Sequence, residues 1–265
     1  MIRPQLLSEL NISGLSNLIK SEHFAMSQKL DGRRLMVEIS DLKISGWARS
    51  GLEADIPECI MSDFSRVRSN WTFDGELVDK TYHVFDLIKY PGGDLRKNRW
   101  EDRQEILNAV LTGFSDHIKI VKQSVDPTRK QQFFDACFES KVEGVVFCET
   151  SSTYLMGMRS SRCLKYKFKK TIDCVIVDKS LDSKDNLVLG VYDDNQNLIN
   201  IGKVSALTGD GRHHEFQIGE VVTVEYLYAT KANRLYQPVK PKLRKDKGAK
   251  ECSITQMIHK GTEIL

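Results

Sequence analysis

Short runs of alternating apolar and polar residues recur along this chain and limit the folds that it can adopt. Residues 34–40, RLMVEIS, place Leu35, Val37 and Ile39 on one side of an extended chain, as a half-buried β-strand requires. Two longer segments, 100–114 and 127–140, have helical periodicity instead. Further strand-like runs occupy residues 71–79, 81–88, 143–149 and 162–170. Successive strands with segregated helices predict an α+β fold rather than a repeating βαβ unit.

The C-terminal part of the chain has a different character. Five short strand candidates, separated by turns rich in Asp, Asn and Gly, occupy residues 173–181, 186–194, 198–205, 221–229 and 234–239. Five short strands in a segment of this length are typical of a small barrel such as an OB-fold. We therefore expect two domains, residues 1–170 and residues 171–265.

Positive charge gathers near the C-terminus. The formal net charge is only +3, which by itself gives no argument for a nucleic-acid partner. Between Lys231 and Lys250, however, Asp246 is the only acidic residue among eight Lys and Arg, at positions 231, 234, 240, 242, 244, 245, 247 and 250. Such a segment suits a polyphosphate or nucleic-acid partner, and a solvated, solubilising surface is the alternative.

Cysteine usage and hydropathy indicate the compartment. The six cysteines have no CxxC spacing and several stand in apolar runs, which predicts reduced, mostly buried thiols in a cytoplasmic protein. The first residues lack the continuous apolar segment of a secretion signal, and no run approaches the length of a membrane span. We therefore expect no signal peptide and no membrane partner.

Residues 28–34, QKLDGRR, concentrate charge at the mouth of a predicted strand. A lysine beside other cations loses its proton more easily, which would make the Lys29 amine nucleophilic. Gly32 permits a tight turn or the close approach of a ligand. A salt-bridged surface turn is the alternative, and this segment alone does not decide between the two.

Two carboxylates stand in or beside apolar strands. Glu76 lies within FDGELV and Glu143 directly precedes GVVF. A carboxylate in such a place needs a partner, because an unpaired buried charge is very costly. Glu76 could pair with an arginine such as Arg34 or Arg49, or accept a hydrogen bond from a sugar hydroxyl. Glu143 could hold a metal ion or its waters.

The segment 163–170, CLKYKFKK, alternates most clearly. As a strand it places Leu164, Tyr166 and Phe168 on one face and a row of lysines, residues 165, 167 and 169, on the other. Such a row suits a phosphate site, to which Arg159 could add a donor. The alternative is an edge strand protected from aggregation by its lysines.

Taken together, these segments resemble the covalent nucleotidyltransferase superfamily of ATP-dependent DNA ligases and RNA capping enzymes. KLDGRR is similar to the superfamily's KxDGxR nucleophile motif. Six further segments resemble later motifs in the same order: ARSG at 48–51, FDGELV at 73–78, VFDLI at 84–88, EGVVF at 143–147, LKYKF at 164–168 and LRKDK at 243–247. The Glu–Gly pair and the short chain resemble minimal viral and bacterial DNA ligases. One departure is Cys148, where many DNA ligases carry lysine.

The resemblance implies a fold and a reaction. The fold would be an adenylation domain of antiparallel sheets with helices, followed by an OB-fold β-barrel. The Lys29 amine would attack the α-phosphate of ATP, and the AMP would pass to the 5′-phosphate of a nick in duplex DNA. Lys165 and Lys167 would neutralise the α-phosphate, and Arg34 would bind AMP or the nick phosphate.

The resemblance implies roles for the remaining site residues. Glu76 and Arg49 would hold the ribose, and Phe85 would stack on adenine. Glu143 would support Mg²⁺, with Mn²⁺ as a substitute, and Asp31 would act at the sealing step beside a metal or the 3′-hydroxyl. Gln28 and Arg159 complete the expected nucleotide site. On the second domain, Arg244, Asp246 and Lys247 would orient the leaving pyrophosphate, and a flexible joint near 168–172 would let that domain swing away.

The expected protein is thus a monomeric enzyme of DNA replication, repair or recombination, in the cytoplasm or, if viral, in the host cytoplasm. Two rivals stay open. One is an RNA-directed relative, a capping guanylyltransferase or an RNA ligase. The other is a non-catalytic nucleic-acid-binding module, which would bind DNA or RNA with strong salt dependence but form no covalent adduct. The sequence does not give the pathway or the preferred nick.

Overall fold

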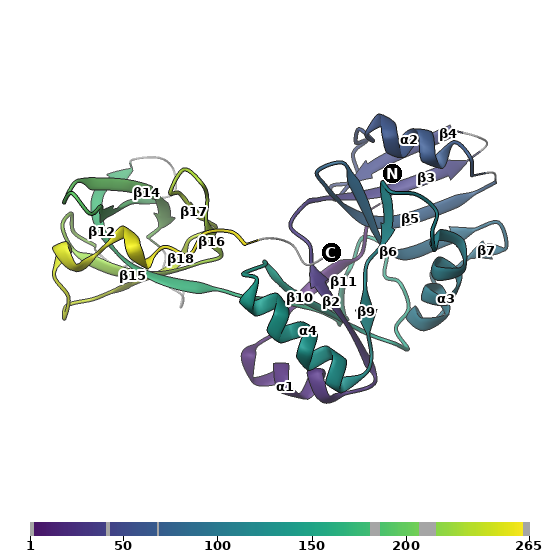
Figure 1. Cartoon of the computed structure of the whole chain (residues 1–265), viewed down its shortest axis with the longest axis horizontal. Coiled ribbons are helices and arrows are strands. Elements are labelled where there is room, and N and C mark those ends of the chain that lie inside the picture. Colours follow the sequence, from purple (N-terminus) through teal and green to yellow (C-terminus); the bar gives the residue numbers. More distant parts are fainter. Residues whose placement is uncertain (1–2, 41–42, 68, 181–185, 207–215, 262–265) are drawn as a thin grey trace. The chain divides into compact units, whose positions relative to one another are not determined.

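The computed structural model describes the chain except residues 1–2, 41–42, 68, 181–185, 207–215 and 262–265. The chain forms two compact units, which divide between Tyr166 and Lys167. Sheets dominate both units and the α-helices lie in the first, so the fold class is α+β, as expected (Figure 1). No helix in the described residues is long and apolar enough to cross a membrane.

The first unit contains a five-stranded sheet that carries Lys29. Its order is β1 (Leu6–Glu9), β11 (Arg159–Lys167), β10 (Gly144–Glu149), β2 (Phe24–Lys29) and β9 (Gln123–Ser124). Strand β2 runs antiparallel to β10 and β9, whereas β1 is parallel to β11. The register places Lys29, the last residue of β2, opposite Gly144.

A second sheet of the same unit carries the arginine and the carboxylates. It consists of β4 (Lys43–Ala48), β3 (Arg33–Ser40), β5 (Trp71–Val78), β6 (Thr81–Tyr90) and β7 (Gly93–Asp94), and β8 (Ile118–Ile120) pairs with β6 in parallel. Leu35, Val37 and Ile39 are buried, as expected. Met36 on the opposite face is also buried, against Ile88 and Tyr154. Strand β3 is therefore covered on both faces.

Four α-helices accompany these sheets in the part of the chain that the structure describes. The two predicted ones are α3 (Trp100–Leu111) and α4 (Pro127–Glu139), and α4 begins where the Asp126 carboxylate accepts a hydrogen bond from the backbone N–H of Arg129. Helices α1 (Ile12–Lys20) and α2 (Glu58–Phe64) were not predicted. Both are short, and α2 buries only Ile60, Asp63 and Phe64, so its periodicity is hard to recognise in the sequence.

Helix α4 anchors the strand that carries Lys29. Its Lys130 is fully buried, and its ammonium group donates to the carbonyls of Leu18, Ser21 and Phe24 at 2.5–2.9 Å. These carbonyls belong to the end of α1 and the start of β2. A cation at the C-terminus of a helix is favourable because it faces the negative end of the helix dipole. Lys130 thus fixes the point at which the chain leaves α1 and enters β2.

The second unit is built on a five-stranded antiparallel sheet. The order is β14 (Leu198–Ser205), β13 (Asn186–Tyr192), β12 (Lys170–Ser180), β15 (Val221–Tyr226) and β18 (Val239–Leu243). One face buries an apolar core that includes Ile176, Leu189, Val222 and Val224. The edge strands β14 and β18 approach each other, although no hydrogen-bonded ladder joins them among the described strands. This arrangement is that of an OB-like, partly open barrel.

Two details differ from the sequence predictions. The fifth strand of the barrel is β18, not residues 234–239, which instead form the short β17 (Leu235–Tyr236) against β16 (Tyr228–Ala229). Gln237 adopts a left-handed conformation (φ 52°) that interrupts the predicted run. Strand β11 ends at Lys167, so Lys169 does not continue the predicted row of three lysines. Two 3₁₀ turns, η1 (Ala249–Glu251) and η2 (Ile254–Gln256), follow β18.

Candidate active site

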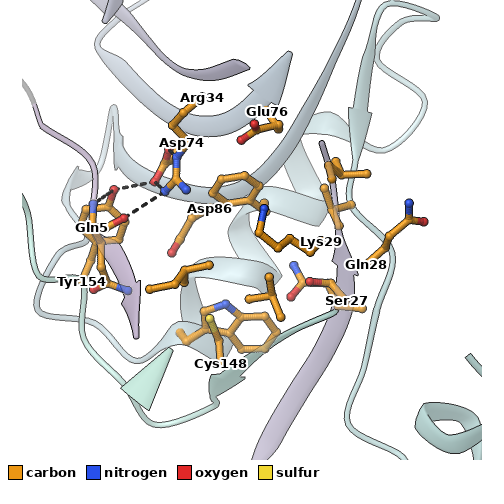
Figure 2. A pocket seen from close by; sticks show the side chains of 17 residues that line it. Gln5, Ser27, Gln28, Lys29, Arg34, Asp74, Glu76, Asp86, Cys148 and Tyr154 are labelled. Atoms are coloured by element: carbon orange, nitrogen blue, oxygen red, sulfur yellow. Dashed lines mark hydrogen bonds and ion pairs between the residues drawn. The ribbon is translucent and has the colours of Figure 1, made fainter. Parts of the chain in front are cut away.

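A cavity in the first unit is lined by both of its sheets (Figure 2). The strands β2 and β10 contribute Ser27, Gln28, Lys29, Val146 and Cys148, and β3, β5 and β6 contribute Arg34, Asp74, Glu76, Phe85 and Asp86. The segment that carries the predicted nucleophile, Lys29, and the strand that carries Glu76 therefore meet at this cavity. Trp100, Tyr154 and Gln5 also line the cavity.

The Lys29 ammonium group is held by a carboxylate. Its Nζ lies 2.5 Å from Oε2 of Glu143, and both side chains are largely buried, with 20% and 4% of their surfaces exposed. Glu143 directly precedes β10, and the β2–β10 register brings the two residues together. An ion pair sheltered from water is stronger than one on the surface. The pair fixes the Lys29 amine at the edge of the cavity.

Arg34 belongs to a buried polar cluster. Its Nε and Nη2 donate to the two oxygens of Asp74 at 2.7 and 2.6 Å, in the bidentate geometry that suits a guanidinium. Tyr154 donates its hydroxyl to Asp74 at 2.5 Å, and Gln5 accepts from Arg34 through its carbonyl (Figure 2). Burial opposes the charge on Arg34, but Asp74 outweighs that effect and holds the arginine pKa above its ordinary value. Arg34 is thus a fixed cation in the cavity.

Asp74 holds Arg34, so the alternative in which Glu76 forms an ion pair with Arg34 is not the one found. The register places Glu76 opposite Arg34 on the neighbouring strand. Burial raises the pKa of Glu76 to about 7, against the opposing influence of the charges on Arg34 and Lys29. A carboxyl with this pKa exchanges its proton near neutral pH. Glu76 can therefore either donate or accept a hydrogen bond.

The raised pKa of Glu76 makes stability depend on pH. Between the ordinary value of 4.5 and about 7, the folded protein keeps a proton that the unfolded chain has released. The free energy of unfolding should therefore fall by about 3 kcal/mol as pH rises through this interval and change little above it. Thermal unfolding from pH 5 to pH 8 should show this loss in the wild type and not in Glu76→Gln. Parallel curves for the two proteins would contradict the prediction.

A β-bulge turns Phe85 into the cavity. Asp74 pairs with Asp86 but Gly75 pairs with Val84, which leaves Phe85 as the extra residue of β6. The extra residue of a bulge is left unpaired in the hydrogen-bonded ladder, and its side chain is redirected. The guanidinium carbon of Arg34 lies 4.4 Å from the centre of the Phe85 ring, a cation–π contact.

A second buried arginine lies beneath the cavity. Arg103 of α3 is fully buried and donates to both oxygens of Asp86 at 2.8 Å. It also donates to the carbonyls of Asn98 and Ser152. Trp100, at the start of the same helix, lines the cavity. This network makes the floor of the cavity rigid, because its buried polar groups have partners.

The lysines of β11 stand on the strand that neighbours β10 in the sheet, and β10 lines the cavity. The Lys165 ammonium group pairs with Glu9 of β1 at 3.0 Å. Lys167 ends the strand, and its Nζ donates to Gln237 within the second unit. Lys169 is exposed and pairs with Glu225.

Other residues named from the sequence lie at different places. Gln28 is buried beside the cavity, and Asp31 is half-buried in the turn after β2. The neighbouring Gly32 is required, since a Cβ there would collide with the carbonyl of Leu77. Arg49 is exposed at the end of β4 and does not line the cavity. Arg159 is exposed and donates to the carbonyl of Leu7.

Arg244, Asp246 and Lys247 of the RKDK segment form a network with Asp173 of β12. Arg244 pairs with Asp246 at 2.8 Å, and its Nη1 lies 3.3 Å from Asp173. Lys247 donates to the other oxygen of Asp173 at 2.8 Å. Although burial acts in the opposite direction, hydrogen bonds from Lys247 and Thr223 lower the pKa of Asp173. Asp173 is therefore the common anchor of Arg244 and Lys247.

A family comparison covers the segments that build most of this cavity. Residues 76–167, from Glu76 to the end of β11, match the family model described as the ATP dependent DNA ligase domain. This span contains Phe85, Glu143 and both lysines of β11. Over these residues the chain is similar to the ATP-dependent DNA ligase domain family.

Individual ligases are similar to this chain over part of their length. A probable DNA ligase of Dictyoglomus thermophilum is 29% identical over 156 residues, which cover 53% of this chain and 26% of that protein. The DNA ligase of Nanoarchaeum equitans is 26% identical over 179 residues, 61% of this chain and 30% of that protein. The match with this chain spans less than a third of the length of either relative.

Solved ligase structures share the fold over nearly the whole chain. A Lig E DNA ligase matches with a TM-score of 0.67 at 17% identity, covering 92% of this chain and all of that one. The ligase domain of LigD from M. tuberculosis matches with a TM-score of 0.54 at 20% identity, covering 95% of this chain and 97% of that one. These likenesses extend across both units and support the fold expected from the sequence.

Several residues of this cavity were missed from the sequence. Asp74 stands two positions before Glu76 in the same strand, so alternation could have placed it on the cavity face. Asp86 and Arg103 are far apart in sequence, and no spacing rule connects them. Tyr154 and Gln5 lie outside the strands and helices, where the sequence carries no signal for a cavity.

Proposed function

We propose that the protein is an ATP-dependent DNA ligase that seals nicks between a 5′-phosphate and a 3′-hydroxyl in duplex DNA. The observation that carries this proposal is the Lys29 amine, held 2.5 Å from Glu143 at a cavity that also contains Arg34, Glu76 and Phe85. The ligase names of the relatives and the match over residues 76–167 support it.

In the first step, the nitrogen lone pair of Lys29 forms a bond to the α-phosphorus of ATP, and the bond to the bridging oxygen breaks as pyrophosphate leaves. Lys29 must first lose its proton. Positioning and neutralisation of charge supply most of the catalysis in such transfers.

Two further transfers complete sealing. An oxygen of the 5′-phosphate at the nick attacks the same phosphorus and releases Lys29, which joins AMP to the DNA through a pyrophosphate bond. The 3′-hydroxyl then attacks the 5′-phosphate and AMP leaves. In this scheme Arg34 binds AMP or the nick phosphate, Glu76 binds the ribose, and Phe85 stacks on adenine, with Gln28 beside it. Arg49 and Arg159 would have to move to reach the nucleotide.

The carboxylates suit Mg²⁺. Magnesium in nucleotide sites uses one or two protein carboxylates together with phosphate oxygens and water. Glu143 lies beside Lys29, and Asp31 follows two residues later, so both can serve this purpose at the mouth of the cavity. Bound Mg²⁺ would neutralise charge on the phosphates. Mn²⁺ has similar ligand preferences and would substitute.

We propose that the first unit is the adenylation domain and the second the OB-fold domain, with the boundary near residue 170. Arg244, Asp246 and Lys247 would orient the leaving pyrophosphate, and a joint at 168–172 would allow the OB domain to move between steps. The protein would act as a cytoplasmic monomer, or in the host cytoplasm if viral, in DNA replication, repair or recombination.

Covalent labelling tests the proposal directly. The protein is incubated with Mg²⁺ and α-labelled ATP or GTP and separated by denaturing electrophoresis, and sealing is measured on DNA–DNA, RNA–DNA and RNA–RNA nicks. We expect label from ATP and sealing of the DNA–DNA nick. Label from GTP would indicate a capping enzyme, and sealing restricted to RNA strands would indicate an RNA ligase. Nick binding without label would indicate a binding module.

The lysines at the end of β11 give a graded prediction. Replacing Lys165 or Lys167 with alanine should reduce labelling by about a hundredfold, because a fixed cation beside developing phosphate charge is lost. Lys169→Ala is the matched control and should change labelling little, since Lys169 is exposed and lies beyond the strand. The same labelling assay measures all three variants. Equal small losses of labelling at the three positions would favour the edge-strand interpretation.

A further inference from the structure

Two glutamines connect Phe85 with the wall of the cavity. Gln104 of α3 is buried, and its Nε2 donates a hydrogen bond to the backbone carbonyl of Phe85 at 3.0 Å. Gln123 of β9 donates its own Nε2 to Oε1 of Gln104 at 2.9 Å, and Gln123 lines the cavity. The roles proposed above use neither side chain. This pair of hydrogen bonds is therefore a part of the site that still has no assigned purpose.

The order of these hydrogen bonds fixes how both amide groups are turned. A backbone carbonyl can only accept, so Gln104 must direct its amide nitrogen to Phe85 and its amide oxygen to Gln123. That oxygen requires a donor, and in the Gln123 side chain only the amide nitrogen can supply one. Turning the Gln123 amide by half a turn would place two oxygens against each other. Its Oε1 is consequently held on the other side of the amide group as a hydrogen-bond acceptor.

The register brings Gln123 close to the reacting part of the cavity. In the pairing of β2 with β9, Gln123 lies opposite Ser27, which also lines the cavity and stands two residues before Lys29. The Gln123 side chain then extends from the sheet of Lys29 to Gln104, which holds the backbone of Phe85. A base that stacks on Phe85 has its faces covered, so the side walls of the cavity can contact only its edge.

We propose that Gln123 determines the nucleotide specificity of adenylation by accepting a hydrogen bond from the 6-amino group of adenine, with Gln104 as its positioning residue. The inference rests on the proposed function, in which ATP is the substrate. Guanine carries a carbonyl oxygen where adenine carries this amino group, so GTP would set an acceptor against Oε1 of Gln123. A site built around a polar contact strongly rejects an analogue that cannot make it. The two glutamines therefore select ATP over GTP.

Adduct formation with three nucleotides tests this contact. The full chain is incubated with Mg²⁺ and ATP, GTP or purine riboside 5′-triphosphate, which has hydrogen in place of the 6-amino group. Intact mass then measures the rate at which each adduct forms. We expect ATP to react about tenfold faster than the purine riboside analogue, which lacks one hydrogen bond, and about a hundredfold faster than GTP, which opposes two acceptors.

Variants of the two glutamines assign these preferences. Gln123→Met keeps the length of the side chain but removes the acceptor, so ATP and the analogue should react at equal rates. Gln104→Met frees the Gln123 amide to turn, which should raise the rate with GTP about tenfold relative to ATP. Circular dichroism verifies folding, and Gln123→Met alone decides the inference if Gln104→Met does not fold. Gln131→Ala is the matched control and should keep the wild-type ratios, because Gln131 is exposed on α4 and donates to Asp135.

Equilibrium binding separates this inference from the proposed function. Calorimetry compares AMP with purine riboside monophosphate without a covalent step. The wild type should bind AMP about tenfold more tightly, and Gln123→Met should remove this preference. A wild type without the preference, or the same preference in Gln123→Met, would overturn the inference even if ATP forms the adduct. A protein that forms no adduct would instead contradict the proposed function, and the calorimetric ratio would then decide the role of Gln123.

Discussion

Replacing Lys29 with alanine will reduce covalent labelling by α-labelled ATP by about 10³-fold or more, since no other residue can replace a covalent nucleophile. The structure places this amine at the cavity, at the end of a strand fixed by Lys130. Denaturing electrophoresis after incubation with Mg²⁺ and labelled ATP measures the effect. Sealing of a nick that already carries AMP should survive better, because that substrate has passed the first two steps.

Two companion variants separate chemistry from structure. Lys29→Arg keeps a positive charge that can pair with Glu143, but a guanidinium stays protonated at neutral pH and cannot attack phosphorus, so labelling should still be lost. Lys122→Ala removes an exposed lysine near the same sheet and should label like the wild type. Retention of label by Lys29→Ala would show that the adduct forms elsewhere.

Replacing Asp74 with alanine will lower the free energy of unfolding of the first unit by about 3–5 kcal/mol, because it leaves the Arg34 guanidinium buried without its counter-ion. The side chain of Asp74 is fully buried, and it binds both Arg34 and the Tyr154 hydroxyl. Urea unfolding followed by circular dichroism measures the change.

Asp94→Ala provides the matched control for this prediction. Asp94 pairs with Arg96 at 2.5 Å, but about half of each side chain is exposed, so its loss should cost less than about 1 kcal/mol. Asp74→Asn, which keeps the size and one acceptor oxygen, should fall between the two. Similar losses for Asp74→Ala and Asp94→Ala would show that burial does not strengthen the Arg34 pair.

The sequence predicted the framework better than the contacts within it. Alternation located β3, β5, β6 and β10, and helical periodicity located α3 and α4, because each of these elements is long enough to show its period. Helices α1 and α2 were missed since so few of their residues are buried. The predicted row of three lysines was too long, because β11 ends at Lys167, before Lys169. Alternation alone does not mark where a strand ends.

The same contrast holds in the site. Lys29, Arg34, Glu76, Phe85 and Gln28 could be placed together from the order of their motifs, and all line one cavity. Their partners could not be chosen, because pairing depends on register and on bulges. Arg34 binds Asp74 rather than Glu76, and Glu143 pairs with Lys29. Three-dimensional geometry was needed to recognise Asp173 as the anchor of Arg244 and Lys247.

The parallel pairing of β1 with β11 has a consequence for the order of folding. Residues 6–9 pair with residues 159–165, and the Gln5 backbone bonds to Tyr154 across 149 positions. Contacts that close such long loops form late, because the entropy of closure is lost before they contribute stability. During synthesis, β1 must therefore wait until nearly all of the first unit has left the ribosome. The cavity is among the last features to form, and a chain released early would expose the unpaired edge of β10 to other chains.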